Sequence, residues 1–271
     1  MEELDGKVAI VTGGGSLAAG IGNGRAAAVR LAESGARVVI VDIADRNMAE
    51  TQELIAERGG ECLCVRGDVS LPDDCAAIVR RAVETWGRVD VLVNNVGVAG
   101  PPGTAVDVDL DAWDACLRVN VTSMMLMSRF AIPRMRAAGG GSIVNLSSAA
   151  GLIGGHPSLA YSTAKGAIVN LTRSMAAAHG PDGIRVNAVA PGYMYTPNVY
   201  AQGLSQDDRE RRRLAAPLRT EGTGWDVGEA VLFLAGGRSR WITGVVLPVD
   251  AGLTSALAVP DSMTVQSPRP R

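Results

Sequence analysis

The sequence lacks a long apolar run: its 271 residues contain no stretch of 18 consecutive apolar residues, the minimum for a membrane-spanning helix. The N-terminus lacks a basic segment followed by an apolar run, so we expect no signal peptide. Neither sign of charge is in excess, since the formal net charge is −2. Electrostatics therefore give no reason to expect a nucleic-acid or anionic-membrane partner. These absences predict a cytoplasmic protein.

Histidine and cysteine are scarce, with two and four residues respectively. Cys62 and Cys64 lie together in the segment ECLCV, but the histidines, His156 and His179, are far from them in sequence. Too few ligands come close together for a metal centre, so no metal site is expected. Reduced thiols in the protein core are the simpler interpretation of the cysteines.

Short apolar runs rich in β-branched residues recur along the chain, and they are continuously apolar rather than alternating. Strands that are buried on both faces have this pattern. Between the runs lie segments of helical period, such as 24–35 and 73–87, and each of these ends at a glycine that can cap a helix. The alternation predicts an α/β Rossmann fold with a doubly wound parallel sheet of about seven strands and helices on both faces. The expected strands are 7–12, 37–42, 61–65, 89–94, 142–147, 184–190 and 245–250.

No shift in composition marks a second domain, so residues 1–254 are expected to form one domain. Residues 193–222, between the sixth strand and the last helix, are the one expected excursion from the alternating pattern. From residue 255 to residue 271 the periodicity is lost and proline becomes frequent, which predicts an extended or disordered tail.

The glycine-rich segment 11–28 follows the first strand and leads into a helix. In this setting glycines let the backbone approach a dinucleotide pyrophosphate, and the helix N-terminus offers unpaired amides; a plain glycine-rich turn is the alternative. Asp42 favours the first interpretation, because it ends the second strand 18 positions after Gly24, where a carboxylate binds the adenosine ribose. The next residues, Ile43 and Ala44, are not basic. Because a carboxylate repels the 2′-phosphate of NADP, NAD is the expected cofactor.

Further motifs follow in order: GDVS at 67–70, NNVG at 94–97, RVNV at 118–121, NLSSAAG at 145–151, YSTAK at 161–165, VAPGYMYT at 189–196 and WITGVVLPVDAG at 241–252. In this order they resemble the short-chain dehydrogenase/reductase family over nearly the whole chain. The family's first motif, TGxxxGxG, is lengthened here. About five extra residues separate Gly13 from the later glycines of the motif, which we identify as Gly22 and Gly24.

The resemblance implies a nicotinamide dinucleotide cofactor, NAD in view of Asp42, in one catalytic domain. It also implies a homo-oligomer, with a tetramer favoured, in which the segment 110–135 and the helix that carries Tyr161 form one interface. The residues expected to bind the cofactor are Gly13, Ser16, Gly22, Asn23, Gly24, Asp42, Ile43, Asp68, Val69, Asn94, Asn95, Val96, Gly97, Tyr161, Lys165, Pro191, Gly192, Met194 and Thr196.

The resemblance further implies that Asn120, Ser148, Tyr161 and Lys165 are the catalytic residues. Tyr161 and Lys165 lie four apart in a segment of helical period, so they share one helix face. A free tyrosine has a pKa of about 10, and a lysine ammonium with the positive nicotinamide ring would lower it. Tyr161 could then accept the substrate's hydroxyl proton while Ser148 stabilises charge on the substrate oxygen. By the family pattern Lys165 also holds the nicotinamide ribose, and Asn120 positions a water.

The segment 193–222 corresponds to the family's substrate lid, and its apolar residues Met194, Tyr195 and Tyr200 predict a pocket for a ring or a medium-sized apolar body. The charged run 207–213 is expected to be the solvated face of a lid helix. The residues expected to contact substrate are Ser148, Ala150, His156, Tyr161 and Tyr195, although a lone histidine such as His156 is more often structural.

The predicted function is NAD-dependent hydride transfer between a secondary alcohol, or its ketone, and nicotinamide. Two alternatives stay open. An NADPH-dependent carbonyl reductase is disfavoured by Asp42. A non-catalytic dinucleotide-binding protein would be expected to have lost the tyrosine or the lysine, and both are present here.

Overall fold

All seven expected strands form, and each begins and ends within two residues of its expected limits. The computed structural model describes residues 3–201 and 203–256. The strands lie in one fully parallel sheet of order β3-β2-β1-β4-β5-β6-β7, which is the single-domain α/β Rossmann architecture predicted above. Their bounds are β1 (Val8–Thr12), β2 (Arg37–Asp42), β3 (Cys62–Arg66), β4 (Val91–Asn94), β5 (Gly141–Leu146), β6 (Ile184–Pro191) and β7 (Val246–Val249).

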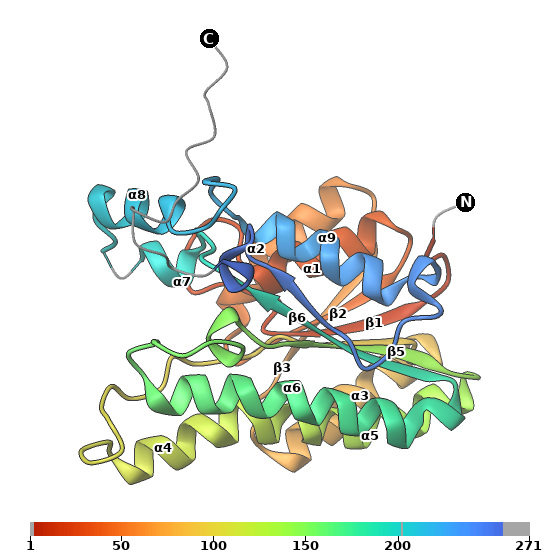
Figure 1. Ribbon diagram of the computed structural model, residues 1–271. Helices are drawn as coiled ribbons and strands as arrows, with labels where there is room; N and C mark the ends of the chain where they lie inside the picture. Colours follow the sequence, from red (N-terminus) through yellow and green to blue (C-terminus); the bar gives the residue numbers. More distant parts are fainter. Residues whose placement is uncertain (1–2, 202, 257–271) are drawn as a thin grey trace.

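Helices cover both faces of the sheet (Figure 1). On one face lie α1 (Asn23–Glu33), α2 (Asp45–Glu57) and α9 (Gly224–Ala235), and on the other lie α3 (Pro72–Trp86), α5 (Ser123–Ala137) and α6 (Leu159–His179). The shorter helices are α4 (Leu110–Leu117), α7 (Pro197–Tyr200) and α8 (Gln206–Leu214). The two helix ends expected at glycines are confirmed, because Gly35 and Gly87, which follow α1 and α3, have φ of +91° and +77°.

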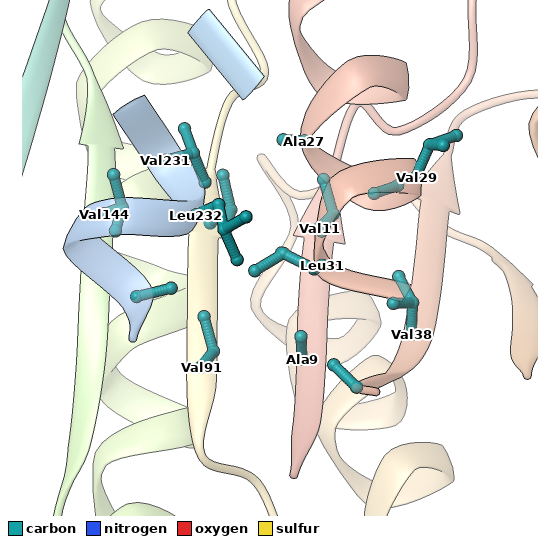
Figure 2. Close-up of a cluster of buried hydrophobic side chains, with 14 of the residues drawn as sticks. Ala9, Val11, Ala27, Val29, Leu31, Val38, Val91, Val144, Val231 and Leu232 are labelled. Atoms are coloured by element: carbon teal, nitrogen blue, oxygen red, sulfur yellow. The ribbon is translucent and has the colours of Figure 1, made fainter. Parts of the chain in front are cut away.

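The core consists of two apolar clusters, one on each face of the sheet. Side chains alternate between faces along a strand, so Ala9 and Val11 of β1 join the α1/α9 cluster, whereas Val8 and Ile10 join the α3/α5 cluster. Figure 2 shows the first cluster, in which strand valines face side chains of α1 and α9. Both faces are covered, and this is why the strand sequences are continuously apolar.

The strand order reverses at β1, whose neighbours are β2 and β4. Ligands of open parallel α/β sheets bind at the crevice outside the carboxyl ends of the strands at such a switch point. The glycine-rich loop follows β1 and the NNVG motif overlaps the end of β4, so this edge of the sheet carries most of the expected site.

The segment 193–222, which is expected to form the lid, contains α7 and α8, and α8 has no buried residue, as the charged run 207–213 predicted. The last element among the described residues is a 3₁₀ turn, η5 (Leu253–Ser255). Most of the expected tail, residues 257–271, lies outside the described residues. Within 3–201 and 203–256, no helix combines the length and apolar character needed to cross a membrane. All four cysteines are free thiols.

Candidate active site

Glycines shape the loop after β1, because side chains at two of its positions would collide with neighbouring groups. Gly13 has a φ of +62°, and a Cβ there would lie 2.9 Å from Asn95 Nδ2. A Cβ at Gly24 would overlap the carbonyl of Gly13. At Gly22, by contrast, a Cβ would meet nothing within 4 Å. Gly22 is the N-cap of α1, and the first amides of a helix have no partner within it. The open space beside Gly22 would therefore let a pyrophosphate reach these amide donors.

The segment between Gly13 and Gly22 contains the inserted residues and is called the inserted loop below; side chains of α1 and α2 hold it in place. Arg25 is fully buried; its guanidinium donates to the carbonyl of Gly20 and to Thr51 Oγ1 (3.0 Å), and pairs with Glu50 Oε2 at 2.5 Å. Thr51 Oγ1 in turn donates to the carbonyl of Gly14 at 2.8 Å. The amide of Ser16 donates to the carbonyl of Asn47 at 2.9 Å, and the Ser16 hydroxyl donates to the carbonyl of Ala18. Both donors of Ser16 are therefore hydrogen-bonded within the protein.

Asp42 ends β2 beside this loop. Its carboxylate accepts hydrogen bonds from Asn47 Nδ2 at 2.7 Å and from the amide of Ala44 at 3.4 Å. A Cβ at Gly15 would lie 2.8 Å from Asp42 Oδ2, so glycine lets the loop approach the carboxylate. Asn47 therefore fixes the orientation of Asp42 relative to the glycine-rich loop.

Other residues expected to bind the cofactor serve mainly to position the backbone. Asn95 Nδ2 donates to the carbonyls of Thr12 and Gly13 (3.1 and 2.9 Å), which joins the ends of β1 and β4. Asn94 is buried and donates to Asn145 Oδ1 at 2.9 Å. The carboxylate of Asp68 accepts from the amide of Ser70 at 2.9 Å.

Of the apolar residues expected to bind the cofactor, some lie in the core and one lies at the surface. Val69 and Met194 are buried in the two core clusters, and Val96 packs against one of them, so cofactor contacts from these positions would have to involve the backbone. Ile43 is exposed. Gly192 passes close to the end of β7, because a Cβ there would lie 2.7 Å from Asp250 Cβ. Pro191 and Thr196, the remaining members of this segment, are buried.

Ser148, Tyr161 and Lys165 lie together beyond the end of β5. Ser158 caps α6 by accepting from the amide of Tyr161 at 3.2 Å, which places Tyr161 in the first turn and Lys165 one turn later. The Ser148 side chain lies close enough to the Tyr161 hydroxyl to lower the pKa of the tyrosine. Lys165 Nζ lies 5.6 Å from the centroid of the Tyr161 ring and donates to the carbonyl of Leu146 at 2.8 Å. The three expected catalytic side chains therefore form one cluster.

Burial dominates the electrostatics of this cluster. Lys165 is 4% exposed, and burial lowers its pKa from 10.5 to about 8. Burial raises the pKa of Tyr161 above its ordinary value of 10.0, while the hydrogen bond to Ser148 acts in the opposite direction. Proximity to Lys165 therefore does not by itself bring the pKa of Tyr161 below its ordinary value.

Asn120 lies in a short π-helical segment, η1 (Arg118–Thr122), between α4 and α5. Its side-chain amide is fully buried and donates to the carbonyls of Val98 and Cys116, both at 3.0 Å. A Cβ at Gly97 would lie 2.8 Å from Asn120 Oδ1 and 3.2 Å from Lys165 Nζ. Gly97 is thus the point at which Asn120 and Lys165 approach each other. Departures from α-helical geometry of this kind are frequent at functional sites.

The structure divides the expected substrate contacts into two groups. The ring centroid of His156 lies 4.7 Å from that of Tyr161, and its Nδ1 accepts from the amide of Ser158 at 3.1 Å, so His156 borders the catalytic cluster. Ala150 donates its amide to Ser148 Oγ at 3.2 Å. Tyr195 instead packs within the lid, 3.9 Å from the guanidinium carbon of Arg209.

The motif analysis missed two positions that support the site, one beside the cluster and one in the glycine loop. Gly151 lets the turn after Ser148 pack onto α6, because a Cβ there would lie 2.5 Å from the carbonyl carbon of Lys165. Arg25 anchors the inserted loop, as described above. The glycine-rich context signals Gly151 only weakly, and the pairing of Arg25 with Glu50 depends on the folded chain.

Three features define a dinucleotide-binding oxidoreductase: a glycine-rich loop at the switch point, an acidic residue at the end of β2, and a Tyr/Lys pair beside a serine. Comparison with known proteins supports this class. A family model described as enoyl-(acyl carrier protein) reductase matches residues 17–254.

Among curated proteins, the chain is 40% identical over 249 residues to cis-4-hydroxycyclohexanecarboxylate dehydrogenase of Sinomonas cyclohexanicum, covering 92% of this chain and 97% of that protein. It is 40% identical over 257 residues to 2-(S)-hydroxypropyl-CoM dehydrogenase 3 of Xanthobacter autotrophicus, covering 93% and 98%. A crystal structure of a short-chain dehydrogenase/reductase from Burkholderia xenovorans superposes with a TM-score of 0.90 at 38% identity, covering 95% of this chain and all of that one (100%).

The chain therefore belongs to the short-chain dehydrogenase/reductase family. It is an oxidoreductase of alcohols or ketones, and its cofactor is a nicotinamide dinucleotide.

Proposed function

We propose that the protein is an NAD-dependent dehydrogenase that oxidises secondary alcohols and, in the reverse direction, reduces ketones. Tyr161 is the general base in the oxidation and the general acid in the reduction. The observation that carries the proposal is the cluster of Ser148, Tyr161 and Lys165, in which the serine lies beside the tyrosine hydroxyl and the buried lysine amine lies 5.6 Å from the centroid of the tyrosine ring. Since Asn120 is present as well, the chain retains all four expected catalytic residues.

When bound, a nicotinamide dinucleotide would supply the acceptor for the hydride that leaves the carbinol carbon. Tyr161, as phenolate, accepts the proton of the substrate hydroxyl, and the C–O bond becomes a carbonyl. Ser148 donates a hydrogen bond to the substrate oxygen and stabilises negative charge on it. In the reverse direction, Tyr161 returns the proton to the oxygen of the ketone.

This role requires the pKa of Tyr161 to fall, because burial raises it above its ordinary value. Lys165, with a pKa of about 8, remains largely protonated at neutral pH and supplies one positive charge. The positively charged oxidised nicotinamide would supply a second. We therefore expect Tyr161 to become a competent base only when the cofactor is bound.

The assignment of NAD rests on Asp42. Asn47 holds its carboxylate beside the glycine loop, where it can accept hydrogen bonds from the ribose hydroxyls and would repel a 2′-phosphate. Gly13, Gly22 and Gly24 would accommodate the pyrophosphate. One observation favours the NADPH-dependent alternative: Arg66 is the register partner of Asp42 in the neighbouring strand β3, so a basic residue lies close to the ribose position.

We propose a ring-containing or medium-sized apolar secondary alcohol as substrate. Leu152 and Ile153 support this, because they are exposed on the segment between Ser148 and His156. The relative from Sinomonas cyclohexanicum is named for a hydroxylated six-membered ring. Polyols and phosphorylated sugars should be poor substrates.

The proposal is tested by incubating the protein with NAD⁺ and a panel of alcohols while NADH formation is followed. The panel contains cyclohexanol, cis-4-hydroxycyclohexanecarboxylate, 2-butanol, mannitol and a sugar phosphate, and Tyr161→Phe serves as the blank. Wild type should oxidise one or more of the apolar alcohols, and Tyr161→Phe should lose at least about 100-fold in rate while still binding NADH. Turnover that survives in Tyr161→Phe would show that another residue is the base.

We also assign residues 1–254 to one catalytic domain with 193–222 as its substrate lid, and we propose that the domain forms a homotetramer. Exposed apolar side chains at Leu110 of α4 and Met125 of α5 support an interface through these helices. Light scattering on the purified chain measures the mass directly, and a monomer would refute the tetramer.

A further inference from the structure

The residues inserted in the glycine loop contact the lid, which is defined here as residues 193–201 and 203–222. The hydroxyl of Tyr200, at the end of α7, donates to the carbonyl of Ala19 at 2.7 Å. Gly20, the next residue of the loop, has a φ of +111°, and a Cβ there would overlap the Tyr200 hydroxyl. A loop without the inserted residues would lack this contact.

Tyr200 is in turn held by the rest of the lid. The ring centroid of Tyr200 lies 4.9 Å from that of Tyr195. The guanidinium carbon of Arg209 lies 3.9 Å from the ring centroid of Tyr195. Arg209 also forms a two-pronged ion pair with Glu221, at 2.5 and 2.6 Å. This stack connects α7, α8 and the segment before α9, so a displacement of Tyr200 would be transmitted to α8.

The opposite side of the loop is attached to the helices that frame the glycine cradle. Arg25 donates to the carbonyl of Gly20, and Glu50 Oε1 accepts from the amide of Gly20 at 3.4 Å. Helix α9, which follows the lid, also touches the loop, because a Cβ at Gly224 would lie 2.7 Å from the carbonyl of Ile21. The inserted loop thus lies between α1 and α2 on one side and the lid on the other, and it contacts both.

We infer that Tyr200 is a positioning residue that couples the glycine loop to the lid, so that a dinucleotide on the loop orders the lid for substrate. This rests on the proposed function, in which the loop binds the dinucleotide. The hydrogen bond from Tyr200 to Ala19 is the link between the two parts.

Trypsin provides a test that needs no substrate, since α8 carries four arginines, Arg209, Arg211, Arg212 and Arg213. Wild type, Tyr200→Phe and Tyr193→Phe are digested with and without saturating NADH, and cleavage within α8 is followed by mass spectrometry. Tyr193→Phe is the matched control, because it removes a hydroxyl from a lid tyrosine whose ring packs under Arg212. NADH affinity is measured for each variant by cofactor fluorescence.

The expected result is that NADH slows α8 cleavage roughly fivefold in wild type and Tyr193→Phe, and less than about twofold in Tyr200→Phe, as for the loss of one hydrogen bond. Gly20→Ala, which displaces Tyr200, should behave like Tyr200→Phe. The inference is overturned if NADH binds but does not protect wild type, or if it protects Tyr200→Phe equally well. If NADH does not bind wild type, the proposed function itself fails, so the two failures are distinguishable.

Discussion

The catalytic cluster and the lengthened glycine loop lie at the same edge of one sheet, but different interactions hold them in place. Asn120 and Lys165 are buried, and backbone carbonyls of the sheet and the helices fix their side chains. The inserted loop is held by an arginine and a tyrosine that reach in from neighbouring helices, and its Leu17 is 76% exposed. Proton transfer needs the first kind of rigidity, whereas binding and release of ligands tolerate the second. Substitutions in the cluster should therefore affect chemistry, and substitutions in the loop should affect affinity.

Outside the four expected catalytic residues, the largest effect is expected for Gly97→Ala, which places a methyl group between Asn120 and Lys165. Its Cβ would lie 2.8 Å from Asn120 Oδ1, so the buried amide or the lysine must move. Displacements of this size at catalytic groups reduce rates by roughly 10- to 100-fold. The measurement is kcat with NAD⁺ and the best alcohol. Gly180→Ala, where a Cβ meets nothing within 4 Å, is the control and should retain wild-type kcat.

Lys165→Met should lose activity but gain stability at neutral pH, because it removes a buried charge. The folded-state pKa of about 8 lies below the ordinary 10.5, so between these values the unfolded chain binds more protons and wild type becomes more stable as pH rises. The advantage of the variant in unfolding free energy should therefore shrink by about 2 kcal/mol from pH 7 to pH 9.5.

Urea denaturation at the two pH values measures this difference. Lys7→Met removes the chain's other lysine from an exposed site and is the control for the loss of an amine. An advantage of Lys165→Met that is the same at both pH values would mean that burial does not perturb the lysine.

Arg25→Met tests the statement that substitutions in the inserted loop affect cofactor affinity rather than chemistry. It removes the anchors of Gly20 and Thr51 and leaves Glu50, which is 42% exposed, to be solvated. We expect NADH affinity to fall roughly tenfold, as for the loss of charge-assisted hydrogen bonds, while kcat at saturating cofactor stays near wild type. Arg30→Met, on the same helix but paired with Glu33 and Glu229, should leave the affinity unchanged. A fall in kcat without a change in affinity would contradict the division of roles.

The smallest effect is expected for Cys116→Ala. Asn120 Nδ2 contacts Cys116 Sγ at 3.3 Å but keeps its stronger bonds to two backbone carbonyls in the variant. Thiols are weak hydrogen-bond acceptors, so kcat should change by less than about threefold. A larger loss would give the sulfur a role in placing Asn120, and steady-state rates decide between the two outcomes.

The sequence predicts the sheet well and the loop contacts poorly, for a physical reason. Strands buried on both faces must be apolar throughout, so their positions can be read locally, as for β2 at Arg37–Asp42. The inserted loop was located from glycine spacing alone. Its anchors, Arg25 with Glu50 and Tyr200 with Ala19, join residues far apart in the chain and leave no local pattern.

The proximity of the expected catalytic residues was predictable, because a helix fixes the spacing of Tyr161 and Lys165 and the motif order supplies Ser148. The π-helical turn around Asn120 was not predictable, since it inserts in a continuous helical pattern. Nor was the burial of Val69 and Met194, whose motif positions suggested cofactor contact; tertiary packing places both side chains in the core.

The most direct test of the account is a fluorescence titration of wild type and Asp42→Ala with NADH and, separately, with NADPH. The account predicts that wild type binds NADH at least about tenfold more tightly than NADPH, the contribution expected of charge-assisted hydrogen bonds to a ribose. Asp42→Ala should abolish most of that preference. Equal affinity for both cofactors in wild type, or an unchanged ratio in Asp42→Ala, would contradict the account.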